Sequence, residues 1–114
     1  MSKELDTIQK ENNLNKIFTI DYADVTGINH EYMITLSSNN SDTMDNFCTI
    51  KFKKDSEHLG VDDSDLLEIV RDRLKCFQKG IYKCREYACA ITHIEEALMW
   101  INKHRQDTKE KHIN

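Results

Sequence analysis

Hydrophobic residues alternate with polar ones in the first half of the chain and change to a helical spacing in the second half. Three alternating runs, at residues 17–22, 31–37 and 47–54, predict β-strands. The segments between them, 25–30 and 37–42, contain the Gly, Asn, Ser and Asp residues that favour turns. Short connections favour an antiparallel meander, and three strands with one apolar face need a cover. The helices predicted downstream can supply that cover.

The apolar spacing of three and four residues after Asp62 predicts two helices. One face of the first helix is apolar, at Leu67, Val70, Leu74 and Phe77. Gly80 follows this run and predicts the end of the first helix. The second helix has a heptad seam at Cys84, Tyr87, Ile91, Ile94, Leu98 and Ile101. A second apolar edge on this helix predicts contact with another subunit, and consists of Ala90, Ala97 and Trp100.

These patterns predict an α+β protein, in which a small N-terminal antiparallel β-sheet precedes a long antiparallel helical hairpin. Residues 1–15 lack a sustained period, and we expect them to form a flexible arm. Residues 16–61 are the predicted β-sheet region and residues 62–114 the predicted hairpin, in one folded unit overall. Without a proline, the second helix runs from about Cys84 past Arg105, or roughly 30 Å. Because a three-stranded sheet cannot cover such a helix, we expect a homo-oligomer.

Composition and motifs exclude several classes of function. A net charge of −4 argues against coating a nucleic acid polymer, and no apolar run is long enough for a membrane span. The polar first residues are unlike a secretory signal, so we expect a cytoplasmic protein with reduced cysteines. The chain has no glycine-rich phosphate loop, GxSxG or HExxH motif, and its histidines are scattered. We therefore expect no catalytic residues, no metal and no cofactor.

A binding site is better supported, at the turn between the two predicted helices. Residues 77–87 combine aromatic and cationic side chains with a glycine. Aromatic rings stack on nucleobases at about 1–3 kcal/mol per base, arginine forks phosphate oxygens, and a helix start attracts anions. Thr92, farther along, is able to hydrogen-bond a ligand. The competing interpretation is that Phe77 and Tyr87 are core residues, because both lie on apolar seams.

Glu95 lies next to the apolar seam and needs a partner if it is partly buried. Arg73, Arg85 or a lysine of another chain is the expected partner. A surface pairing within its own helix is the alternative.

The stretch DLLEIVRDRLKCFQKG, followed by CREYACAITHIEEALMWINKHR, resembles a helical hairpin shared by two families of phage anti-defence proteins. These are the first Thoeris anti-defence family and the second anti-CBASS family. The resemblance covers Asp65 to about Asn102. Anti-CBASS proteins of this type are nearly all helical, whereas the Thoeris type has a small β-sheet before the hairpin. The predicted strands therefore favour the Thoeris type.

The resemblance implies a sponge that sequesters the glycocyclic ADP-ribose signal of Thoeris without cleaving it, in the cytoplasm of the infected bacterium. Some family members also bind cyclic oligonucleotides at separate sites, and they assemble as dimers or hexamers. The family's FQxG and CRE elements and its cationic tail imply ligand-binding roles for Phe77, Gly80, Arg85, Glu86, Tyr87 and Arg105. Tyr87 stands where the Thoeris type commonly has asparagine, so the resemblance leaves the particular ligand open. Two other readings remain: an oligomeric regulatory or structural module that binds no ligand, and a nucleotide-cleaving enzyme.

Overall fold

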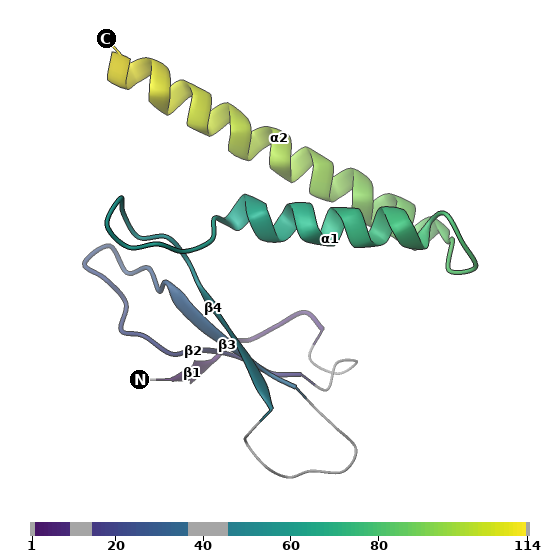
Figure 1. Ribbon diagram of the computed structural model, residues 1–114, viewed down its shortest axis with the longest axis horizontal. Helices are drawn as coiled ribbons and strands as arrows, with labels where there is room; N and C mark the ends of the chain where they lie inside the picture. The colour runs from purple at the N-terminus through teal and green to yellow at the C-terminus, as the bar shows by residue number, and fades with distance from the viewer. Residues whose placement is uncertain (1, 10–14, 37–45, 114) are drawn as a thin grey trace. The chain divides into compact units, whose positions relative to one another are not determined.

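The computed structural model describes residues 2–9, 15–36 and 46–113, with the side chains of the last helix described as far as Lys109. The chain divides into two compact units, Met1–Val61 and Asp62–Asn114, and each is described by itself. Figure 1 shows the strands in the first unit and the two helices in the second. The prediction of an α+β protein with a small antiparallel sheet ahead of two helices is confirmed.

The first unit is built on an antiparallel sheet of four strands, in the order β1-β2-β3-β4. The strands are β1 (Lys3–Glu4), β2 (Ile17–Thr19), β3 (Glu31–Thr35) and β4 (Phe47–Lys51). The alternating runs thus predicted β2 to β4, although each strand ends before its run does. β1 was not predicted, and it lies within the segment expected to be a flexible arm. Its two polar residues carry no period, and they are extended because they pair with β2.

The register of the strands gives the sheet two faces. Thr19 pairs with Tyr32, which in turn pairs with Ile50, so these three side chains share one face. Thr19 is buried, and the ring of Tyr32 meets that of Phe52 edge-on at 5.6 Å between centroids. Tyr32, Ile50 and Phe52 are half-buried, so this face packs around Thr19 without burying an apolar side chain completely.

A loop held by carboxylates connects β2 to β3. Asp24 accepts hydrogen bonds from the backbone N–H groups of Thr26 (2.8 Å) and Ile28 (3.2 Å), and lies 2.7 Å from Nε2 of His30. Gly27, with φ of 87°, supplies the left-handed residue that the turn needs. The turn predicted at residues 25–30 is therefore present, whereas the one predicted at 37–42 lies outside the described residues.

The end of the first unit lies close against β4. The backbone N–H of Val61 donates to the carbonyl of Lys51, and the N–H of Lys53 donates to the carbonyl of Val61, both at 2.9 Å. A Cβ atom on Gly60 would approach the carbonyl carbon of Phe52 to 2.5 Å. This approach leaves room only for glycine at position 60.

The second unit is a hairpin of α1 (Asp63–Phe77) and α2 (Arg85–Ile113). The N–H of Asp62 donates to the Asp65 carboxylate at 2.8 Å and so secures the start of α1. At the other end the prediction for Gly80 was wrong: α1 ends at Phe77, with Gln78 as its cap, and Gly80 does not have a positive φ. The side-chain oxygen of Gln78 accepts the N–H of Cys84 at 2.8 Å, which fixes the turn into α2.

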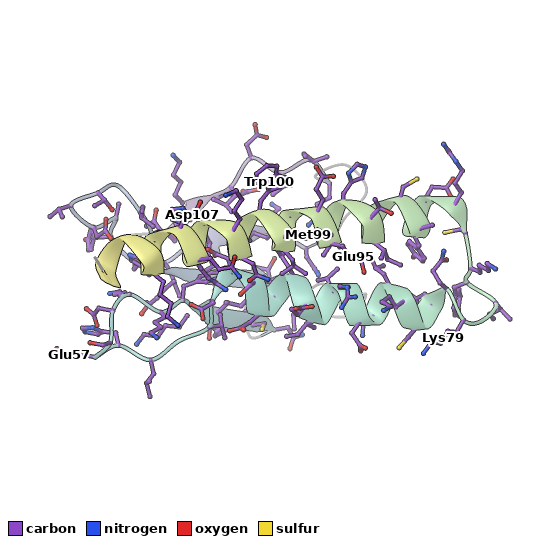
Figure 2. All side chains as sticks on the ribbon, turned by 90° about the horizontal axis from the view of Figure 1, so that it is seen from above. Glu57, Lys79, Glu95, Met99, Trp100 and Asp107 are labelled. Carbon is purple, nitrogen blue, oxygen red and sulfur yellow. The ribbon has the colours of Figure 1, made fainter. Side chains whose placement is uncertain are left out.

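The predicted heptad seam of α2 is confirmed by burial. Its members are all half-buried except Leu98, which is 9% exposed and is the one buried apolar residue among those described. Figure 2 shows α1 and α2 side by side, with Met99 and Trp100 labelled on α2. Met99 and Trp100 are exposed, and no residue of α1 is buried. One hairpin alone therefore leaves much of its apolar surface in water. Among the described residues, no helix is long and apolar enough to cross a membrane.

Candidate functional site

A cluster of aromatic rings lies at the turn of the hairpin. Phe77, the last residue of α1, is stacked on Tyr87 of α2, with 5.7 Å between centroids and 30° between planes. Tyr82, in the turn, meets Phe77 edge-on at 5.9 Å. The guanidinium carbon of Arg73 lies over the Phe77 ring, 5.5 Å from its centroid. Three side chains, one from each helix and one from the turn, thus gather around the Phe77 ring.

We call Arg73, Phe77, Tyr82 and Tyr87 the turn cluster. Its three aromatic rings differ in exposure. Phe77 and Tyr87 are half-buried, as expected for residues on the apolar seams, whereas Tyr82 is 64% exposed. The rings of Phe77 and Tyr87 pack against each other, as expected for core residues. Both rings also still reach the surface, as a binding site requires. The accessible aromatic ring of the cluster is that of Tyr82.

The turn is also a local centre of positive charge. Residues 72–86 contain five cations against two carboxylates, a formal charge of +3 in a chain of −4. The cations are Arg73, Lys75, Lys79, Lys83 and Arg85. All five are exposed, and none forms an ion pair with a described residue. Such a group of unpaired cations beside aromatic rings suits an anion that carries an aromatic group.

The middle of the hairpin is arranged differently. Nε of Arg71 donates to the Glu95 carboxylate across the two helices at 2.8 Å, and Arg71 also lies 3.5 Å from Glu68. The hydrogen bond to Glu95 raises the pKa of Arg71. The prediction that Arg73 or Arg85 is the partner of Glu95 was therefore wrong. The antiparallel register brings Arg71, a residue of the α1 seam face, opposite Glu95.

These residues line a shallow hollow that opens to solvent. It encloses about 360 Å³ and is lined by Glu68, Arg71, Glu95, Leu98 and Met99. The guanidinium here already has two carboxylate neighbours. The hollow therefore has no unpaired cation with which to bind an anion.

The structure brings only some of the predicted site residues together. Phe77 and Tyr87 are in contact, and Gly80, Arg85 and Glu86 belong to the same turn and first turn of α2. Thr92 lies farther along α2, where its hydroxyl donates to the backbone carbonyl of Ala88 at 3.2 Å.

Arg105 lies at the opposite end of the hairpin, where it donates to the Ser64 hydroxyl at 2.9 Å. Twenty residues of helix separate Arg105 from Arg85, which is about 30 Å along the axis. Within one chain, Arg105 therefore does not belong to the turn cluster.

Sequence reasoning missed three residues of the turn. Gln78 positions the start of α2, Arg73 lies on the central ring, and Tyr82 is the exposed ring. Arg73 precedes Phe77 by four residues, a spacing that places two side chains next to each other on a helix. This spacing could have predicted their contact.

The chemical groups at the hairpin turn are cationic and aromatic. No three metal-ligating side chains gather among them. The groups at the turn are guanidinium and ammonium ions, aromatic rings and the first amides of α2, which have no acceptor within their own helix. In proteins generally, groups of these kinds bind anions and stack on aromatic rings.

Comparison with known families matches residues 44–106 to the family described as Acb2/Tad1, hairpin domain. The match covers more than half of the chain, and it includes both α1 and most of α2. The protein belongs to this family, as the resemblance of the hairpin predicted.

A relative with a curated name is a protein of the Bacillus phage SBSphiJ7 called Thoeris anti-defense 1. It is 44% identical to this chain over 54 residues. The matched region is 47% of this chain and 38% of the relative. The similarity therefore concerns a segment of each protein.

Proposed function

We propose that this protein is a phage anti-defence sponge, which binds a cyclic nucleotide immune signal at the hairpin turn and sequesters it without cleaving it. The observation that carries the proposal is the turn cluster, with aromatic rings inside a local charge of +3 in an acidic chain. The family and the relative's name support the anti-defence role, and the ligand class is the one that the resemblance of the hairpin implies. Glycocyclic ADP-ribose is the first candidate, and cyclic oligonucleotides are the second.

The chemistry of such a ligand matches the site. A cyclic nucleotide has phosphates, which attract guanidinium and ammonium groups, and a base, which stacks on aromatic rings. A sponge with a nanomolar dissociation constant needs about −12 kcal/mol of binding free energy. Charge-assisted bonds from Arg85 and stacking in the cluster of Phe77 contribute to this, and neither needs a catalytic group.

A second copy of the chain completes the site in this proposal. Arg105 is about 30 Å from the turn of its own chain, so it reaches a ligand there only from a partner subunit. The exposed Met99 and Trp100 give the hairpin an apolar surface for such a partner. We therefore expect a homo-oligomer, a dimer or a hexamer, acting in the cytoplasm of the infected bacterium.

Isothermal titration with glycocyclic ADP-ribose isomers, a cyclic dinucleotide and a cyclic trinucleotide tests this function. We expect at least one probe to bind with a dissociation constant below 1 μM, about −8 kcal/mol. Phe77→Ala should lose most of this affinity, whereas Phe47→Ala, a half-exposed phenylalanine of β4, should keep it.

Failure of all probes to bind the folded protein would contradict the proposed function. It would favour the alternative, an oligomeric module that uses the hairpin only for assembly. In that case Phe77→Ala would change stability and subunit number alone.

A further inference from the structure

We propose that Arg73 and Tyr82 are the recognition pair of this site, with Tyr82 stacking on the base of the ligand and Arg73 binding its phosphates. This inference rests on the proposed function and names two residues that the sequence pattern did not assign to it. It gives Phe77, whose ring contacts both residues, a positioning role in addition to the ligand-binding role that the family resemblance implies.

The environment of Phe77 is the first argument. Its ring already contacts Tyr87, Tyr82 and the guanidinium of Arg73. Phe77 is half-buried, so these contacts leave only part of its ring to a ligand. Tyr82 is the most exposed ring of the cluster, so a base can stack on it without disturbing the seam between the helices.

The second argument concerns the two arginines of α1. Arg71 has two carboxylate neighbours, Glu68 and Glu95, and its charge is used within the hairpin. Arg73, two residues later and on another side of the helix, is exposed and has no ion-pair partner among the described residues. Its contact with the Phe77 ring is a cation–π interaction. At an exposed position such a contact is weaker than a forked bond to phosphate. A phosphate can therefore replace the Phe77 ring as the partner of the Arg73 guanidinium.

The third argument is distance. The guanidinium of Arg73 and the ring of Tyr82 both lie within about 6 Å of the same ring centroid. Both are therefore within reach of one nucleotide, whose base and phosphates are separated by a single ribose. Lys79 and Lys83, on either side of Tyr82 in the sequence, add positive charge to the same turn.

Titration of the full-length protein with glycocyclic ADP-ribose and a cyclic trinucleotide, at two or more salt concentrations, tests the pair. Arg73→Gln should weaken the binding probe by about 10- to 100-fold, and the remaining affinity should depend less on salt. Arg73→Lys should recover only part of it, because the ammonium lacks the guanidinium fork. Tyr82→Ala should weaken binding by about 10-fold, whereas Tyr82→Phe, which keeps the ring, should stay within about 2-fold.

Matched controls are an exposed tyrosine and an exposed lysine away from the turn. Tyr22→Ala and Lys54→Gln, both at exposed positions of the first unit, should leave the affinity unchanged. Helical circular dichroism and thermal unfolding show that each variant is folded, which we expect because Arg73 and Tyr82 are exposed.

The outcomes separate this inference from the proposed function. If the unaltered protein and both Arg73→Gln and Tyr82→Ala bind equally well, the recognition pair is wrong and the sponge function stands. Equal losses in Tyr82→Phe and Tyr82→Ala would overturn the stacking role, because the hydroxyl would then be the binding group. If the unaltered protein binds neither probe, the proposed function fails and this inference fails with it.

Discussion

The loops of the sheet unit and the turn of the hairpin both carry many charges, but they differ in what surrounds those charges. In the sheet unit, Asp24 accepts backbone N–H groups of its own loop, and Asp55 accepts those of Glu57 and His58 at 2.9 Å. In the hairpin turn, cations such as Lys79 and Lys83 have no carboxylate partner among the described residues. Charges with internal partners fix a loop. Charges without partners are available to a ligand.

The same contrast recurs within α1, over two residues. Arg71 pairs with Glu95 across the hairpin, whereas Arg73 lies on an aromatic ring. Substitutions at the turn should therefore change ligand affinity with little effect on stability. Substitutions at internally paired or closely packed positions should do the reverse.

The largest expected effect is on the turn. Arg85→Gln removes an exposed, unpaired cation from the start of α2. We expect the affinity for the bound cyclic nucleotide to fall by about 10- to 100-fold, the equivalent of one charge-assisted hydrogen bond of about 1.5–3 kcal/mol. Titration measures the affinity, and urea unfolding should show a midpoint that is almost unchanged. A large loss of stability with unchanged affinity would contradict the difference drawn between the charges of the turn and the internally paired charges.

Substitutions at Gly60 and Gly80 compare how tightly the sheet unit and the hairpin turn are packed. An alanine at Gly60 would place its Cβ 2.5–2.7 Å from three backbone atoms of the β4 region, and we expect Gly60→Ala to lower the free energy of unfolding by about 1–3 kcal/mol. Gly80 has nothing within 4 Å of its Cβ position and no positive φ. Gly80→Ala should leave stability unchanged or raise it by about 0.4–1 kcal/mol. Urea denaturation of both variants makes the comparison, and equal destabilisation would contradict it.

A smaller effect is expected for the paired arginine. Arg71→Gln breaks the bond to Glu95, which is half-exposed, so the midpoint of thermal unfolding should fall slightly. Ligand affinity should stay the same, because this charge is used within the hairpin. Arg71→Gln and Arg73→Gln differ by two positions in one helix and are each other's controls. A loss of affinity in Arg71→Gln would show that the middle of the hairpin contributes to binding.

The smallest effect concerns acid. The side-chain hydrogen bond from Thr26 lowers the pKa of Asp24, and the one from His58 lowers that of Asp55. Because both folded pKa values lie below the ordinary 3.8, this stabilisation is complete above about pH 4 and is lost as the pH falls further. Amide NMR signals of the loop at Ile28 should therefore shift only at a pH well below 3.8, where the folded Asp24 carboxylate becomes protonated, and Asp24→Asn should abolish the shift. Persistence of the shift in Asp24→Asn would contradict this assignment.

Periodicity in the sequence predicted the elements of this fold well. The heptad from Cys84 to Ile101 is the seam along which the hairpin packs. All five residues of β3 are half-buried, so the alternation there predicted an extended strand but not an alternation of burial. β1 escaped prediction because Lys3 and Glu4 are extended by pairing, a long-range cause without a local pattern.

The candidate site was predictable in part. The turn itself followed from its composition, but the contacts within it depend on the register of α1 against α2. That register determined that Glu95 meets Arg71, and that the guanidinium of Arg73 lies over Phe77. Gln78, and not Gly80, is the cap residue of α1, and its side-chain oxygen also accepts the N–H of Cys84 just before α2 begins.

The central claim is that the hairpin turn retains a cyclic nucleotide and leaves it unaltered. The most direct test mixes glycocyclic ADP-ribose with an excess of the protein, passes the mixture through a membrane that retains protein, and then heat-denatures the retained fraction. We predict that the filtrate is depleted of the nucleotide, and that heating releases it in full with its mass and chromatographic mobility unchanged. A nucleotide that passes freely into the filtrate, or one that is recovered in cleaved form, would contradict the account.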